Sequence, residues 1–161
     1  MGKTNRIKSL VLGLGNPILS DDGAGIWVTQ YIRQRYHKQG VTMMEASQGG
    51  LNLLDLIAGY DKLILIDAIQ TGNGDIGAVY RLETSDLDAT RHVSSFHDIN
   101  LAMALELGKR LGMALPQEIV IFGIEVRDVT TFSEECTPEV QKAIPVAADM
   151  VIKELSTTPS S

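Results

Sequence analysis

The sequence predicts an α/β fold, a single-domain three-layer αβα sandwich with a mostly parallel, twisted sheet. Short aliphatic runs alternate along the chain with longer segments in which apolar residues recur at helical spacing, as in parallel sheets covered by helices. The run at residues 63–66, Leu-Ile-Leu-Ile, has the continuous apolar character of a strand buried on both faces. A chain of 161 residues without an internal repeat or a linker predicts one domain over residues 1–161, with frayed ends at about 1–7 and 156–161.

The first half of the chain alternates between strands and helices. Residues 9–12 form an apolar run that leads into two glycines, which predicts a buried strand with a sharp exit turn. Residues 26–39 carry apolar side chains on one helical face, and residues 41–46 predict a second strand. A short helix is expected over residues 51–58, and the aliphatic run at residues 62–66 predicts the central strand.

The second half continues this alternation. Residues 78–82 alternate as in a strand, whereas residues 84–96 are polar and poorly periodic and predict a surface loop. A helix is expected from about His97, and residues 118–123 predict a further apolar strand. Thr137 supplies a capping hydroxyl directly before a proline, a combination typical of a helix start, so a final helix is expected there.

Composition excludes several classes of function. The formal net charge of −6 argues against nucleic acid as the main partner, because phosphate binding needs clustered Lys and Arg side chains. No segment approaches the ~20 consecutive apolar residues that span a bilayer, and the apolar run after Lys8 is too short for the core of a signal peptide. Cys136 is the single cysteine, so a disulfide framework is excluded and a buried thiol is expected. These features predict a cytoplasmic protein that does not insert into membranes.

The most informative segment follows the first predicted strand. Gly13 and Gly15 end the apolar run, and the adjacent carboxylates Asp21 and Asp22 lie within a second turn bounded by glycine. This order places the acidic pair in the crevice at the carboxyl end of a strand, where open α/β sheets keep their sites. The segment is not a dinucleotide-binding fingerprint, because Ile18 replaces the third glycine of that motif.

Two further residues are candidates for a site. Asp67 directly follows four aliphatic residues, so it is predicted to end the buried strand and to emerge at the carboxyl edge of the sheet; a helix cap or turn residue is the alternative. His97 lies at a predicted helix start, where the helix dipole disfavours the imidazolium form and helps to hold a neutral ring that can bind metal. A lone histidine is more often structural or solvated, so its position alone leaves its role open.

The chain resembles the hydrogenase maturation proteases. These enzymes begin with a strand, a Gly-x-Gly-Asn turn, a short apolar stretch and an acidic pair before glycine, which matches residues 13–16, 17–20 and 21–25 here. Residues 122–125 and 137–140 resemble the late strand and the final helix of the family, so the resemblance covers nearly the whole chain. Peptidyl-tRNA hydrolases share the Gly-Leu-Gly-Asn-Pro part, but they continue with a tyrosine and a Thr-Arg-His-Asn stretch, whereas this chain continues with Asp-Asp-Gly.

The resemblance implies a metal site made by Asp22, Asp67 and His97. In the family, the second acidic residue after the first strand, an aspartate ending a central strand and a downstream histidine bind the metal; members often have glutamate where this chain has Asp22. Two carboxylates and one imidazole suit a borderline divalent ion and leave coordination positions open. Gly49 and Gly50 resemble the glycine loop that lines the family's cleft and are the expected substrate-binding residues, although the family's usual Asp-Gly-Gly-Thr start is replaced here.

The resemblance also implies an activity and a partner. Hydrogenase maturation proteases are endopeptidases that remove a short C-terminal extension from the precursor of a nickel–iron hydrogenase large subunit after nickel has been inserted. The nickel is carried by the substrate, and another divalent ion can substitute for it at the site. Asp22 and Asp67 are the candidate catalytic groups of this aspartyl protease-like hydrolase, which is expected to be a monomer when isolated.

Two alternatives stay open at this point. A peptidyl-tRNA hydrolase would need a basic cleft for RNA, which an acidic chain with 14 Lys and Arg residues disfavours. A non-enzymatic, metal-gated chaperone would use the same three ligands to bind the precursor subunit without cutting it. The sequence lacks the His-Glu-x-x-His and Gly-x-Ser-x-Gly motifs of common hydrolases, which is consistent with a metal held by the substrate.

Overall fold

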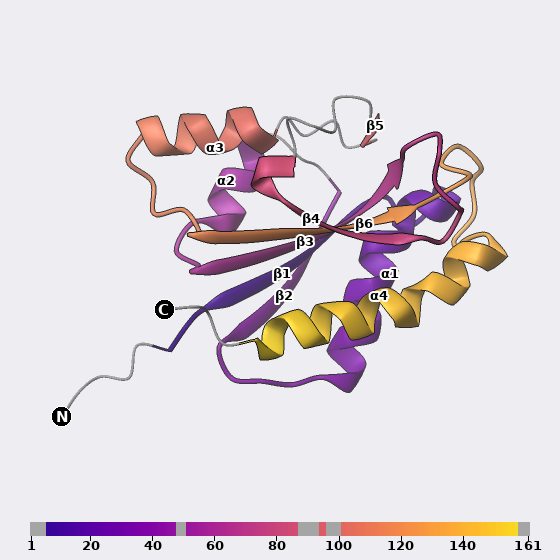
Figure 1. Cartoon of the computed structure of the whole chain (residues 1–161), viewed down its shortest axis with the longest axis horizontal. Helices are drawn as coiled ribbons and strands as arrows, with labels where there is room; N and C mark the ends of the chain where they lie inside the picture. The colour runs from indigo at the N-terminus through magenta and orange to yellow at the C-terminus, as the bar shows by residue number, and fades with distance from the viewer. Residues whose placement is uncertain (1–5, 48–50, 87–93, 96–100, 158–161) are drawn as a thin grey trace.

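A twisted sheet with helices on both faces forms the centre of the computed structural model, which describes residues 6–47, 51–86, 94–95 and 101–157 (Figure 1). The strands are β1 (Ser9–Leu14), β2 (Val41–Ala46), β3 (Lys62–Gln70), β4 (Val79–Glu83), β5 (Ser94–Ser95) and β6 (Glu118–Glu125). The helices are α1 (Ala24–Arg35), α2 (Leu51–Ile57), α3 (Leu101–Arg110) and α4 (Pro138–Ser156), with 3₁₀ turns η1 (Ser20–Gly23) and η2 (Thr84–Asp86).

The sheet is mostly parallel, as the sequence predicts. Its strand order is β2-β1-β3-β6-β4, and β1, β2, β3 and β6 run parallel to one another. The strand β4 is antiparallel to β6, and the short strand β5 pairs antiparallel with the end of β3. Helices α2 and α3 lie on one face of the sheet and α1 and α4 on the other, which confirms the three-layer αβα sandwich (Figure 1).

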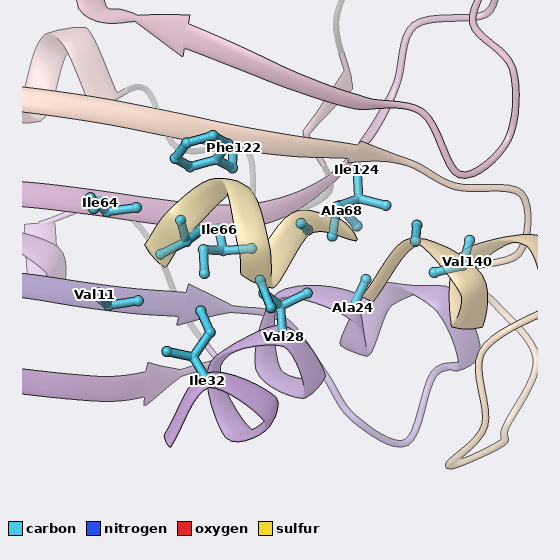
Figure 2. Close-up of a cluster of buried hydrophobic side chains, with 14 of the residues drawn as sticks. Val11, Ala24, Val28, Ile32, Ile64, Ile66, Ala68, Phe122, Ile124 and Val140 are labelled. Carbon is cyan, nitrogen blue, oxygen red and sulfur yellow. The ribbon is translucent and has the colours of Figure 1, made fainter. Parts of the chain in front are cut away.

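The central strand β3 is buried on both faces, which explains its uninterrupted aliphatic sequence. On one face, Ile64, Ile66 and Ala68 belong to the core that also contains buried residues of α1 and α4 (Figure 2). On the other face, Leu63 and Leu65 belong to a second core with buried residues of α2 and α3. Because side chains alternate between the faces of a strand, the next odd-numbered positions of β3 face the α2–α3 layer.

The prediction that Asp67 ends the central strand is wrong. The strand β3 runs on to Gln70, because β6 continues to pair with it as far as Ile69 and β5 pairs with its last two residues. These pairings are made by segments distant in sequence, so the local aliphatic run from residue 63 to 66 could not reveal them. Asp67 therefore lies inside a strand and is not a cap or a turn residue.

Other element bounds differ by a few residues from those predicted. The first helix ends at Arg35 and not at residue 39, because Tyr36 adopts an extended backbone that leads toward β2. The first strand extends through Gly13 to Leu14, and the polar segment 84–96 contains η2 and β5 among its described residues. The final helix starts after Thr137 as predicted and runs to Ser156. No described helix combines the length and the apolar character needed to cross a membrane.

Candidate active site

The candidate site lies where β1 ends beside β3, toward the carboxyl edge of the sheet. Gly15 has a φ of +153°, and a Cβ atom there would overlap the carbonyl oxygen of Asp22. A Cβ atom on Gly25 would overlap the carbonyl oxygens of Leu14 and Ile66. These glycines therefore let the first turn of α1 and the preceding turn η1 approach the backbones of both strands, an approach that a larger side chain would block.

Asp22 is held by the glycine turn that follows β1. The residue is 4% exposed, and its Oδ2 atom accepts a hydrogen bond from the backbone N–H of Asn16 at 3.1 Å. The turn η1 that carries it contacts β3. The carboxylate thus comes from the exit of β1 but lies at the edge that β1 and β3 share, as the sequence predicts.

Asp67 is buried in the strand next to β1. It is 5% exposed, and its position in the alternation of β3 puts it on the same face as Leu63 and Leu65. Its partner in the register with β6 is Gly123, which has no side chain to crowd the carboxylate on that face. The structure therefore brings Asp22 and Asp67 to the same edge of the sheet on contacting elements.

His97 lies outside the described residues, but the segment before it is placed. Ser95, two residues earlier, pairs with Ile69, two residues beyond Asp67. Ile69 also pairs with a residue of β6, so β5 must lie along the other edge of β3, the edge that β1 occupies up to Ile66. Ser95, the last described residue before His97, therefore lies on the side of β3 where β1 and η1 lie.

Gly49 and Gly50 also lie outside the described residues. The strand that precedes them, β2, ends at Ala46, whose carbonyl oxygen accepts a hydrogen bond from the N–H of Gly15 at 3.1 Å. The chain therefore enters this segment beside the glycine turn of β1. Among the residues with described positions, no group of three or more His, Cys, Asp or Glu side chains forms a metal site, and two of the three expected ligands belong to that set.

Asp21 has a structural role that the sequence did not reveal. It is fully buried, and its Oδ1 atom accepts a hydrogen bond from the N–H of Thr137 at 2.6 Å. Its Oδ2 atom accepts hydrogen bonds from the N–H groups of Arg127 at 3.0 Å and Asp128 at 3.1 Å. The Thr137 hydroxyl also donates to Asp21, at 2.8 Å to Oδ2. The sequence predicted that this hydroxyl caps its own helix, but it makes no capping hydrogen bond there. The two adjacent aspartates of the motif thus have different surroundings.

The sequence comparisons identify the family. A sequence model described as hydrogenase maturation protease matches residues 26–154, most of the chain. The chain belongs to the hydrogenase maturation protease family. It is 28% identical over 155 residues to the hydrogenase expression/formation protein HupD of Bradyrhizobium diazoefficiens, covering 94% of this chain and 79% of that protein. It is also 28% identical over 152 residues to the hydrogenase 2 maturation protease of Escherichia coli, covering 92% and 91% of the two chains.

Solved structures of the family share the fold. The hydrogenase maturating endopeptidase HybD from E. coli superposes with a TM-score of 0.81 at 27% identity, covering 92% of each chain. A hydrogenase 2 maturation peptidase from a Thaumarchaeota archaeon superposes with a TM-score of 0.67 at 28% identity, covering 92% of this chain and 98% of that one. The family expected from the sequence motifs is confirmed, and this chain is a peptide-bond hydrolase of the endopeptidase class. The family membership decides against the peptidyl-tRNA hydrolase and against a non-enzymatic chaperone.

The single cysteine of this protease is buried beside η1. Cys136 is 5% exposed, and its Sγ atom lies 3.7 Å from the carbonyl oxygen of Ser20. Burial, and then the nearby negative charge of Asp21, raises the pKa of the Cys136 thiol to about 12. Because the thiolate and not the thiol is the nucleophile, the burial and the raised pKa of Cys136 both argue against a role for it in peptide-bond hydrolysis.

Glu125, like Asp21, is a buried carboxylate that stabilises a loop at this end of the sheet. Glu125, at the end of β6, is 2% exposed and accepts hydrogen bonds from the N–H of Thr71 at 2.8 Å and the N–H of Gly74 at 3.1 Å. The hydroxyl of Thr71 also donates to it. Glu125 therefore holds the loop between β3 and β4, a role that the apolar pattern of its strand did not indicate.

Proposed function

We propose that this protease removes a C-terminal extension from the precursor of a nickel–iron hydrogenase large subunit, and that it does so once the precursor carries nickel. The observation that carries the proposal is the position of Asp22 and Asp67, both nearly buried, on two elements that contact each other, η1 and β3. The pairing of Ser95, two residues before His97 in the sequence, with the same edge of β3 supports His97 as the third ligand. The names of the maturation proteases that this chain resembles support the choice of partner.

The donor set fits a metal held by the substrate. Asp22 and Asp67 offer carboxylate oxygens and His97 an imidazole nitrogen, which suit a borderline divalent ion such as nickel. Three protein ligands leave coordination positions that the precursor can fill with its own groups. Two acidic side chains at one edge also provide the charge complement for a divalent cation. Recognition of the metal would then distinguish loaded from unloaded precursor.

Hydrolysis needs a group that accepts a proton from the attacking water. Asp22 and Asp67 are the carboxylates available at the proposed site, so one of them is the candidate general base. The bound metal would supply Lewis-acid polarisation at the reacting centre. Gly49 and Gly50, in the connection between β2 and α2, are the proposed contacts for the extended substrate chain. We further propose that the protease acts in the cytoplasm and is a monomer when isolated; its lone buried thiol suits a reducing compartment.

The decisive experiment compares nickel-loaded and nickel-free precursor as substrates of the wild-type protease. We expect cleavage of the loaded precursor and resistance of the nickel-free precursor, because the metal completes the recognition site. The substitution His97→Ala should slow cleavage of loaded precursor by about 100-fold or more, whereas His37→Ala, at an exposed position after α1, should leave the rate unchanged. Efficient cleavage of nickel-free precursor by the wild-type protein would overturn the metal-dependent mechanism.

A further inference from the structure

Asp21 connects the turn η1 to a loop that is distant in sequence. Its carboxylate is fully buried, and its hydrogen-bond donors lie between 106 and 116 positions further along the chain. Across the described residues, these donors are main-chain N–H groups and the hydroxyl of Thr137, without a Lys or Arg side chain. The carboxylate also lies at the amino end of α4, where the helix dipole favours a negative charge.

The backbone of η1 is held by the same loop. The N–H of Asp21 donates to the carbonyl oxygen of Asp128 at 2.9 Å, and the N–H of Ser20 donates to that of Ser133 at 2.9 Å. Ser20 has a φ of +53°, which is a left-handed backbone conformation. This conformation is unfavourable for any residue that has a Cβ atom, so it persists only where the surroundings impose it. The shape of η1 therefore depends on the loop between β6 and α4.

The geometry of a 3₁₀ turn links the two aspartates. Successive side chains in such a turn point about 120° apart, because it has about three residues per turn. Asp21 points toward the loop before α4, while Asp22 points toward the N–H of Asn16. Fixing the rotation of the turn through Asp21 therefore fixes the direction of Asp22.

We propose that Asp21 is a positioning residue of this protease, which holds η1 in the rotation that presents Asp22 to the metal carried by the substrate. The inference rests on the role proposed above for Asp22. A carboxylate suits this task because both of its oxygens accept hydrogen bonds, and both are used here. An amide at position 21 would direct an N–H group at a donor and so break one side of the connection.

The test compares Asp21→Asn with Glu125→Gln in the cleavage of nickel-loaded precursor. Each substitution replaces a buried carboxylate that accepts two main-chain hydrogen bonds or more from a loop, so both should lower Tm. At a temperature at which both variants are folded, D21N should lower kcat by about 10- to 100-fold with KM nearly unchanged. E125Q should keep the wild-type kcat, because no hydrogen bond among the described residues joins η1 to the loop between β3 and β4 that Glu125 holds.

A second pair of variants makes the test independent of the folding of D21N. Thr137→Val removes one hydrogen-bond donor to Asp21 and keeps the shape of the side chain, so it should lower kcat, and Thr137→Ser should restore it by returning the hydroxyl. Wild-type kcat in D21N or T137V would overturn the inference. An equal loss of kcat in E125Q would also overturn it, because loss of any buried carboxylate would then explain the effect.

The variant Asp22→Asn separates this inference from the function on which it rests. If D22N cleaves loaded precursor at the wild-type rate, the role proposed for Asp22 is wrong, and the positioning role falls with it. If D22N is inactive while D21N is fully active, the proposed function stands and only the positioning role is wrong. Loss of kcat in both variants, with E125Q active, supports both.

Discussion

Asp67 is a nearly buried carboxylate inside an apolar strand, and burying a charge costs folding free energy unless the surroundings compensate it. If Asp67 is a ligand or a catalytic group, removal of its charge should affect the cleavage rate more than the stability of the fold. We expect Asp67→Asn, which keeps the shape and removes the charge, to slow processing of loaded precursor by at least about 100-fold. Its free energy of unfolding in urea should change by no more than about 1 kcal/mol.

Asp61, at the opposite end of β3, provides a control for the Asp67 substitution. Asp61, just before β3, accepts a hydrogen bond from the N–H of Lys8 at 2.8 Å and is far along the strand from the proposed site. Asp61→Asn should therefore leave the cleavage rate at the wild-type level. Unfolding of D67N at the assay temperature would instead assign Asp67 a structural role and remove it from the catalytic candidates.

For single residues, the sequence predicted the place of a side chain along the chain's elements better than it predicted the hydrogen-bond partners of that side chain. Asp22 lies in the turn after β1 as predicted, and this turn contacts β3, but Asp67 lies inside β3 and not at its end; the role of both as ligands stays a prediction. The partners of Asp21 could not be predicted, since its hydrogen-bond donors are more than 100 residues away. The same holds for Glu125, whose loop partners precede it by 51 to 54 positions.

Between elements, the contact of α1 with the strand ends depends on glycine. A Cβ atom at Gly25 would overlap the main-chain oxygens of Leu14 and Ile66, and backbone cannot move aside as a flexible side chain can. We expect Gly25→Ala to lower the free energy of unfolding by about 3 kcal/mol, measured by urea denaturation, because overpacking displaces α1 from β1 and β3.

Gly112→Ala is the control for this steric argument. Gly112 has a φ of +71°, but a Cβ atom there would meet nothing within 4 Å, so the substitution tests backbone strain alone. Its expected cost is about 1 kcal/mol. Equal destabilisation by the two substitutions would show that close packing of α1 is not the reason for glycine at position 25.

The carboxyl end of α4 is attached to the sheet by an ion-pair network. Arg81 of β4 donates to both carboxylate oxygens of Glu154, at 3.1 and 2.9 Å, and the buried Lys62 lies 3.3 Å from the same group. Hydrogen bonds from Arg81, and then the charge of Lys62, hold the pKa of the Glu154 carboxyl below its ordinary range. The network therefore attaches the last turns of α4 to β4 and to the start of β3.

This lowered pKa predicts a dependence of stability on pH. The folded state binds the Glu154 proton less well than the unfolded state, so the stabilisation is present above the unfolded pKa of about 4.3 and is lost as the pH falls through the folded value. Glu154→Gln should lower the free energy of unfolding by about 2 kcal/mol at pH 7, with a smaller difference from wild type below pH ~4. Glu83→Gln, which removes an exposed partner of Arg81, should change it by no more than about 0.5 kcal/mol; a constant difference for E154Q across this pH range would contradict the assignment.

Pairing between distant segments limited what could be predicted of the elements. The aliphatic run fixed the position and burial of β3, because that pattern is local, but not its extension to Gln70, which depends on β5 and β6. The short strand β5 falls in a polar segment whose sequence predicts a loop, and its pairing with β3 is a tertiary contact. The succession of the main elements and the mostly parallel sheet were therefore predictable, while β5 and the ends of the elements were not.

Across the whole molecule, stability comes from two apolar cores on opposite faces of one sheet. One core joins β1, β3 and β6 to α1 and α4 (Figure 2), and the other joins the same sheet to α2 and α3. Such burial supplies the main favourable free energy of folding, and its extent grows with chain length. We therefore expect a chain of 161 residues with both cores filled to fold without a metal ion.

The proposed metal-dependent mechanism therefore predicts a protease whose fold is insensitive to chelators. A metal held by the substrate binds the isolated enzyme weakly, so its contribution to folding, which follows RT ln(1 + [L]/Kd), is small. We expect EDTA to shift the Tm of the isolated wild-type protein by less than about 1 °C, and the Tm of Asp22→Asn to respond equally. A structural metal would contribute on the order of 10 kcal/mol, so its removal would lower Tm by tens of degrees. A large decrease in Tm that added divalent metal reverses in the wild type, but not in D22N, would mean that the site holds a resident ion, and recognition of nickel in the precursor would then no longer explain why this edge of the sheet is acidic.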